Sequence, residues 1–149
     1  MKPILFTSLI FLLLACGNSK EISEDKEPRT EPWPLLNEKT FDLTQISKDE
    51  TYGYTKNNPI MVGGVKNSEG PLNERRFLNA LAGPNGEYIS YNRQGSCCQF
   101  KSENGFMGSG LLDVYEVTWK NQTEPVILYI NMYDAGDLKA PVGFTIAKK

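Results

Sequence analysis

Two long apolar runs near the C-terminal end constrain the fold of this chain most. They cover Leu111–Lys120 and Val126–Tyr133, and the turn-rich stretch Asn121–Pro125 separates them. Side chains alternate along each run as they do in β-strands, and the short connection predicts that the two strands pair antiparallel. Apolar residues fall on both faces of each predicted strand. We therefore expect central strands, with a helix on one face of the sheet and an N-terminal segment on the other.

One clear helix is predicted over Pro71–Ala82. A proline lies in its first turn, and Gly83 followed by Pro84 is a stop signal. Shorter strands are expected at five places: Phe41–Leu43, Ile60–Val65, Tyr88–Asn92, Cys97–Lys101 and Val142–Ile146. One helix beside clustered strands predicts an α+β fold, with the main helix packed on an antiparallel sheet of about 4 to 6 strands.

Glu74 occupies an unusual position on the predicted helix. At helical periodicity it falls in the middle of the apolar face that Phe77, Leu78 and Leu81 form, whereas Arg75 points away from that face. A carboxylate there is either a first-turn residue at the rim of the core, favoured by the helix dipole, or a partly buried acid. In the second case we expect an arginine of the sheet as its partner, Arg93 being the nearest in sequence.

Cys97 and Cys98 are adjacent and follow Gly95 and Ser96. Neighbouring residues of a strand point to opposite faces, so a bond between the two sulfurs requires a local departure from strand geometry. Three alternatives are open: two thiols with packing roles, a vicinal disulfide that stiffens the turn after Gly95, or a reactive thiol. A reactive thiol would need a nearby cation, for which Arg93 is a candidate.

The chain contains no histidine. This absence removes Ser-His-Asp and Cys-His catalysis and histidine-bound zinc. We expect no metal and no cofactor, and no nucleic acid partner either, because the net charge is −2 and no basic stripe is present. Asp113 and Glu116 lie on opposite faces of their strand and do not form an acid/base pair. Enzyme activity is therefore not favoured, and the candidate functional cluster is Cys97, Cys98, Glu74, Arg75 and Arg93.

The N-terminus carries an export signal. Met1 and Lys2 precede an apolar stretch that is too short to span a bilayer. The following Leu13-Leu14-Ala15-Cys16 resembles the lipobox of bacterial lipoproteins, which implies cleavage before Cys16 and acylation of this cysteine. This reading divides the chain into a signal peptide (1–15), an acylated cysteine with a disordered polar tether (16–34) and a single globular domain (35–149). Gly17 resembles the residue found at this position in lipoproteins of the outer membrane.

The segment Asn73–Tyr133 also carries a resemblance. It carries Asn-Glu-Arg-Arg-Phe-Leu-Asn-Ala-Leu, Gly-Ser-Cys-Cys, Gly-Leu-Leu-Asp-Val-Tyr-Glu-Val and, together with the residue that follows it, Leu-Tyr-Ile-Asn-Met-Tyr-Asp, and it is similar to a family of small lipoproteins from Bacteroidota-type bacteria. The resemblance covers less than half of the chain. Some members are described as 2-dehydro-3-deoxyphosphooctonate aldolases, but a (β/α)₈ barrel needs about 250 residues, which this domain does not have. The resemblance implies a class and a location, and no catalytic residue.

These observations together predict a lipid-anchored binding or structural module of the cell envelope. Its partners would be the membrane, through the lipid on Cys16, and an envelope protein. The alternatives are a small envelope enzyme that uses the Cys97 and Cys98 region, and an immunity or inhibitor protein.

Overall fold

The computed structural model describes residues 31–148. The predicted signal peptide, Cys16 and most of the predicted tether therefore lie outside the described residues. The described part combines one α-helix, α1 (Gly70–Asn79), with a larger share of strands, so the α+β class is confirmed. No helix among residues 31–148 is long and apolar enough to cross a membrane.

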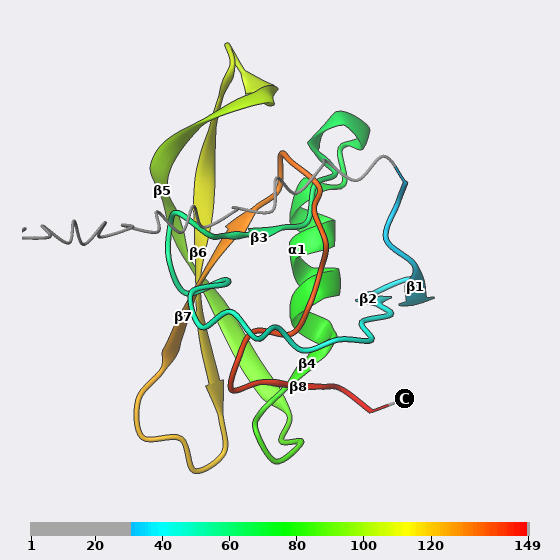
Figure 1. Cartoon of the computed structure of the whole chain (residues 1–149), viewed down its shortest axis with the longest axis vertical. Helices are drawn as coiled ribbons and strands as arrows, with labels where there is room; N and C mark the ends of the chain where they lie inside the picture. Colours follow the sequence, from blue (N-terminus) through cyan, green and yellow to red (C-terminus); the bar gives the residue numbers. More distant parts are fainter. Residues whose placement is uncertain (1–30, 149) are drawn as a thin grey trace, which may run out of the picture.

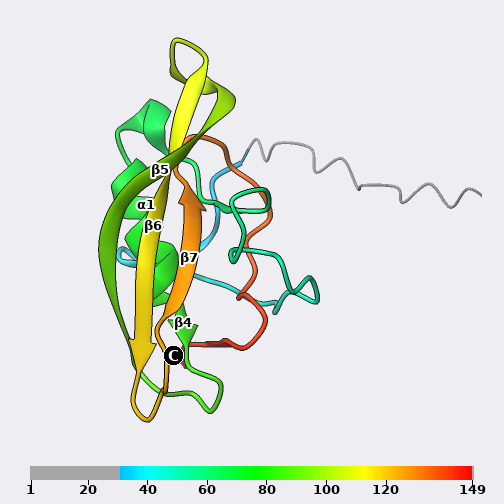
Figure 2. The ribbon, with the colours of Figure 1, turned by 90° about the vertical axis from the view of Figure 1, so that its left-hand side faces the viewer.

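Four strands in the order β3-β7-β6-β5 form the central sheet (Figures 1 and 2). They are β3 (Ile60–Met61), β5 (Ile89–Phe106), β6 (Ser109–Trp119) and β7 (Val126–Asn131). β6 and β7 pair antiparallel, as the two apolar runs predicted. β3 pairs parallel with β7, because the chain crosses over through α1, β5 and β6 between these two strands. The sheet is thus mixed, and the prediction of a wholly antiparallel sheet is wrong at this edge.

The hairpin of β5 and β6 extends beyond the rest of the sheet. Asp113 of β6 is the last residue paired with β7, whereas the pairing of β5 with β6 continues as far as Ser109. Residues 97–112, which we call the arm, form this two-stranded extension, and Figure 1 shows it rising above the other elements. Phe106 and Met107 at its tip are 85% and 88% exposed.

β5 is one strand of 18 residues, where the sequence predicted two strands separated at Gly95 and Ser96. The register shifts between Arg93 and Gly95 and again between Cys97 and Gln99, so Gln94 and Cys98 are bulge residues without a partner on β6. Bulges bend a strand without ending it. The glycine that suggested a break instead lies within a bulge, at φ 143°.

The N-terminal segment forms a hairpin of β1 (Leu35–Asn37) and β2 (Thr40–Phe41). This hairpin packs on the outside of α1, so the helix lies between it and the sheet (Figure 1). Two bonds fix it there: Arg76 Nε donates to the carbonyl of Glu38 at 3.0 Å, and Asn79 Nδ2 donates to the carbonyl of Lys39 at 2.8 Å. The prediction that this segment covers the second face of the sheet is therefore wrong.

α1 ends at Asn79, before the predicted end at Ala82. The next residues form β4 (Leu81–Ala82), which pairs antiparallel with the C-terminal β8 (Thr145–Ile146). Residues predicted to form the last turn of the helix thus form a strand, because a partner strand from the C-terminal end of the chain pairs with them. Tertiary contacts override the local helix signals here.

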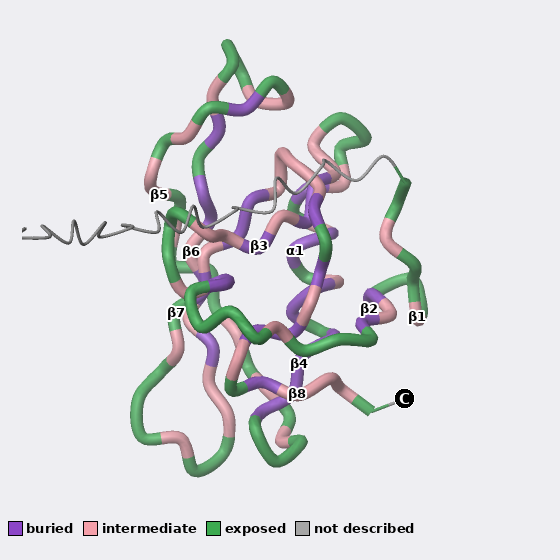
Figure 3. The backbone as a smooth tube through the Cα atoms, viewed as in Figure 1, coloured by how far each residue is buried: buried purple, intermediate pink, exposed green. Residues whose placement is uncertain are grey.

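The core lies between the sheet and α1 (Figure 3). β6 and β7 contribute alternate residues to it, while α1 contributes Phe77 and Leu78, both fully buried. The opposite face of the sheet is more open: Ile127 of β7 is 37% exposed there. Polar side chains on the helix-covered face are therefore shielded from water and need hydrogen-bond partners within the protein.

Candidate functional site

Glu74 is fully buried on the sheet-facing side of α1, with an exposed fraction of 0%. The prediction that it lies on the same helix face as Phe77 and Leu78 is confirmed, since all three are buried. Its Oε2 atom accepts a hydrogen bond of 2.9 Å from the hydroxyl of Tyr115 on β6. Its Oε1 atom is buried and has no hydrogen-bond partner among the described residues.

A second buried acid lies two residues before Tyr115 on the same strand face. Asp113 is 3% exposed, and Arg93 of β5 holds it in a bidentate pair, with Nε and Nη2 each 2.7 Å from a carboxylate oxygen. The hydroxyl of Ser96 donates a third bond of 2.7 Å to Oδ1. We call Glu74, Tyr115, Asp113, Arg93 and Ser96 the carboxyl network.

The pKa of Glu74 is raised to about 7, mainly by burial and next by the charge of the neighbouring Asp113 carboxyl. The hydrogen bond from Tyr115 and the charge of Arg93 act in the opposite direction. Burial, followed by the charge of Glu74, also raises the pKa of the Tyr115 hydroxyl. The network therefore holds a carboxyl group that carries a proton up to near-neutral pH.

The predicted pair of Glu74 with Arg93 is not formed directly. Arg93 binds Asp113 instead, because Asp113 lies on the strand next to it in the sheet, and Arg93 acts on Glu74 only through its charge. Arg75 is exposed on α1 and lies outside the network. Burial raises the pKa of Tyr91 on β5, and the charge of Arg75 offsets part of this rise. Of the predicted cluster, the fold thus brings Glu74 and Arg93 together and leaves Arg75 apart.

Cys97 and Cys98 form a vicinal disulfide, with their Cα atoms 3.7 Å apart. This is one of the three alternatives left open by the sequence. Cys98 is the residue of the second β5 bulge, and its φ of 55° lies in the left-handed region. The bulge supplies the departure from strand geometry that the bond requires. The disulfide follows Ser96 directly and therefore adjoins the carboxyl network.

We expect both sulfurs to resist alkylation in the exported protein. The protein is quenched in acid and unfolded in urea, so that an alkylating reagent reaches buried thiols. Without a reductant, Cys97 and Cys98 should carry no alkyl group; after reduction, each should carry one. Mass spectrometry of the peptide that contains both residues measures this. A Cys97→Ser/Cys98→Ser double variant supplies the background. Alkylation of both residues without a reductant would contradict the disulfide.

Sequence reasoning missed Asp113, Tyr115 and Ser96 as members of the network. Asp113 was considered only against Glu116, although it has the same strand parity as Tyr115 and Val117, which belong to the apolar face. An acid among residues of a buried strand face is the signal that would have found it. Ser96 gives no such signal.

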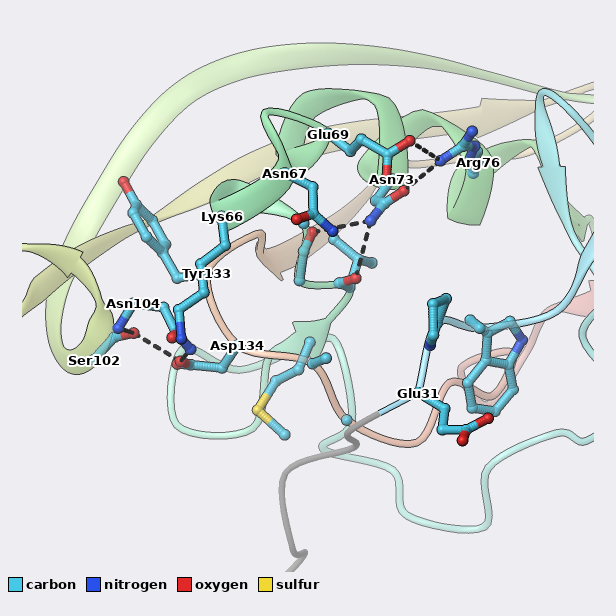
Figure 4. Close-up of a pocket in the computed structure, with 18 of the residues that line it drawn as sticks. Glu31, Lys66, Asn67, Glu69, Asn73, Arg76, Ser102, Asn104, Tyr133 and Asp134 are labelled. Atoms are coloured by element: carbon cyan, nitrogen blue, oxygen red, sulfur yellow. Dashed lines mark hydrogen bonds and ion pairs between the residues drawn. The ribbon is translucent and has the colours of Figure 1, made fainter.

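A cleft of about 860 Å³ lies beside the N-terminal turns of α1 (Figure 4). We call it the trough. Its lining comes from six segments: 31–35, Phe41 of β2, 61–69 with the 3₁₀ helix η1 (Val65–Asn67), the α1 residues 73 and 76, the arm residues 101–104, and 133–136. No member of the carboxyl network lines it. The sequence gives no motif for this site, because its walls are far apart along the chain.

The helix side of the trough is held by Asn73, which is 9% exposed. Its Nδ2 atom donates to the carbonyls of Val62 and Gly63 at 3.5 and 3.2 Å, and its Oδ1 accepts a 2.9 Å bond from Arg76. Arg76 also forms an ion pair of 3.1 Å with Glu69. These contacts fix the loop before α1 against the helix and keep this wall in place.

The arm side of the trough is held by Asp134. Its Oδ1 atom accepts bonds from Ser102 at 2.7 Å and from Asn104 at 2.9 Å (Figure 4). Its Oδ2 atom accepts a 3.0 Å bond from Asn131. Asn131 also caps the end of β7 by accepting from the N–H groups of the next turn. The arm is thus tied to the sheet at the mouth of the trough.

The chemistry available at the two sites differs. The carboxyl network reaches solvent only at Arg93, whose side chain is 45% exposed, and at the exposed Ser96. The oxidised cysteines beside it offer no thiolate. Among residues 31–148, no group of three or more acidic or cysteine side chains could hold a metal ion. The trough is open and has both polar and apolar groups in its lining, so it is the site at which an external molecule can be bound.

Comparisons with known proteins identify no relative: no protein family, no curated protein and no solved structure matches the chain. The resemblance to small envelope lipoproteins stays a prediction.

Proposed function

We propose that this protein is a lipid-anchored binding module of the bacterial cell envelope, held at the outer membrane by Cys16. Its binding site is the trough. The single observation that carries the binding role is this cleft, whose volume lies in the range of small-molecule sites and whose walls are fixed by buried or hydrogen-bonded polar side chains.

The location rests on the sequence. Leu13-Leu14-Ala15-Cys16 has the order of a lipobox, and the polar stretch from Gly17 to Pro34 separates it from the domain. Such a stretch, as a flexible coil, would give a reach of roughly 20 to 25 Å. The domain would then work close to the membrane, with the trough free to meet molecules of the envelope.

Binding is favoured over catalysis by the chemistry of the described residues. An enzyme of the predicted type needs a thiolate beside a base, whereas Cys97 and Cys98 are bonded to each other. Glu74, the group with the most perturbed carboxyl pKa, is fully buried and does not line the trough. Glu74 therefore acts on the packing and stability of the domain interior and not on a ligand in the trough.

The anchoring part of the proposal predicts the outcome of one substitution. Cys16→Ser removes the acyl acceptor, and we expect the domain to leave the membrane fraction, because a tether without acyl chains has no stable hold on a bilayer. Fractionation of envelopes followed by immunoblotting measures this. Cys97→Ser/Cys98→Ser is the matched control and should stay in the membrane fraction. A Cys16→Ser protein that remains membrane-bound after washing with salt would contradict the anchor.

A further inference from the structure

Main-chain groups along the floor of the trough are already paired with one another. Between segments 61–65 and 131–136, N–H donors meet carbonyl oxygens at 2.9, 3.4, 3.2 and 2.9 Å. The carbonyls of Val62 and Gly63 are taken by Asn73. A peptide that binds by strand addition needs a free row of such groups. Recognition in the trough must therefore come from side chains.

The side chains that remain available suit hydroxyl groups. Asn67 is exposed on the wall of the trough and makes no side-chain hydrogen bond to another described residue. Asn104 uses its amide nitrogen on Asp134 and keeps its oxygen as an acceptor. An amide both donates and accepts, as a sugar hydroxyl does. Trp33 and Tyr133 add partly buried aromatic rings to the lining, which can pack against the C–H face of a sugar ring.

The charges of the lining nearly cancel. Arg76 is paired with Glu69, and the Asp134 carboxylate accepts hydrogen bonds from neutral side chains on both oxygens. The other charged residues of the lining are two lysines and two glutamates: Lys66, Lys101, Glu31 and Glu103. Four acidic and three basic residues thus line the trough. A site with so small an excess of one sign has little electrostatic preference for an ionic ligand.

We propose that the trough binds an uncharged oligosaccharide, recognised by the amides of Asn67 and Asn104 and by the rings of Trp33 and Tyr133. This inference rests on the proposed function and adds the class of ligand. The trough extends from the end formed by Ser102, Asn104 and Asp134 to Glu31 (Figure 4), a shape that suits a chain of sugar rings more than a single ring.

The test measures binding to the full acylated chain, purified in a detergent without a sugar head group. The probes are cellotetraose, maltotetraose and chitotetraose, together with a pool of neutral hexapeptides and a series of monocarboxylic acids. Ligand-observed NMR detects weak binding, and calorimetry gives the affinity. We expect at least one tetrasaccharide to bind, and the peptides and carboxylic acids to bind much more weakly.

Two substitutions place the binding in the trough. Asn67→Ala removes an exposed amide from its wall and should weaken tetrasaccharide binding about five- to tenfold, the loss of one net hydrogen bond. Asn92→Ala is the matched control, because Asn92 is an exposed amide of β5 that does not line the trough. The affinity of the Asn92→Ala variant for the tetrasaccharide should equal that of the unchanged protein.

The outcomes separate the ligand class from the binding role. If a saccharide binds, and if Asn67→Ala weakens this binding while Asn92→Ala leaves it unchanged, the result supports both the ligand class and the binding role. If peptides or carboxylic acids bind in an Asn67-dependent way and the saccharides do not, the ligand class is overturned and the binding role stands. If no probe binds, or if binding ignores Asn67, both the saccharide and the assignment of the trough as the binding site are overturned.

Discussion

Replacing Glu74 by glutamine is expected to stabilise the protein at pH 8 by about 3 kcal/mol and to leave its stability at pH 4 nearly unchanged. The pKa of Glu74 is about 7 in the folded protein, against 4.5 for an unperturbed glutamate. A raised carboxyl pKa means that the folded state binds the proton more tightly, so its stabilising effect is complete below pH 4.5 and is lost as the pH rises through 7. The difference corresponds to about 3 kcal/mol.

Glutamine imitates the protonated acid. Its amide oxygen can accept the bond from Tyr115, and its nitrogen can donate toward Asp113, so the ionisation that costs stability above pH 7 no longer occurs. Urea unfolding of both proteins between pH 4 and pH 8 measures the effect. The unchanged protein should lose stability over this range relative to Glu74→Gln, and the two curves should converge in acid.

Glu116→Gln is the control for this prediction. Glu116 lies on the same strand as Asp113 but on the opposite face, where it is partly exposed. We expect its substitution to change the free energy of unfolding by less than about 0.5 kcal/mol at either pH. A Glu74→Gln protein that is equally destabilised at pH 4 and pH 8 would contradict the raised pKa of Glu74, because the difference in stability would then not depend on ionisation of this group.

The central strands and the helix could be predicted because their residues alternate with a clear period. β6 and β7 are long, mostly apolar runs bounded by turn residues, and the helix has an apolar arc with a proline start. Local patterns of this kind survive in the fold when packing agrees with them. The end of α1 was missed because β8, more than sixty residues away, pairs with β4. No window around the helix contains that information.

The polar sites were less predictable than the fold, for two reasons. Glu74 was recognisable because a charge in an apolar arc is locally anomalous, but its partner depends on which strand residue lies nearest in the sheet. Arg93 was the arginine of the sheet nearest in sequence, whereas in the structure Tyr115 binds Glu74 and Asp113 binds Arg93. The trough has no local anomaly at all, since each of its walls is an ordinary polar loop or helix end.

Replacing Arg93 by methionine is expected to destabilise the protein by about 2 to 4 kcal/mol at pH 7. The substitution leaves the Asp113 carboxylate, which is 3% exposed, without its bidentate partner, and a buried charge without a partner is costly. We place the loss below that of a fully buried pair because the Arg93 side chain is 45% exposed, so solvent already screens part of the interaction. Arg75→Met, on the exposed side of α1, should change stability by less than about 0.5 kcal/mol.

A double variant decides whether the loss of stability comes from the unpaired Asp113 carboxylate or from the lost packing of the aliphatic part of the arginine side chain. If the charge of Asp113 is the cause, Arg93→Met/Asp113→Asn should recover most of the stability, because the neutral amide needs no cation. If packing is the cause, the two losses should add.

The pH profile gives an independent check: Arg93 lowers the pKa of Glu74, so its removal should move the pH-dependent loss of stability to higher pH. A profile that stays in place would show that Arg93 does not act on Glu74 through its charge.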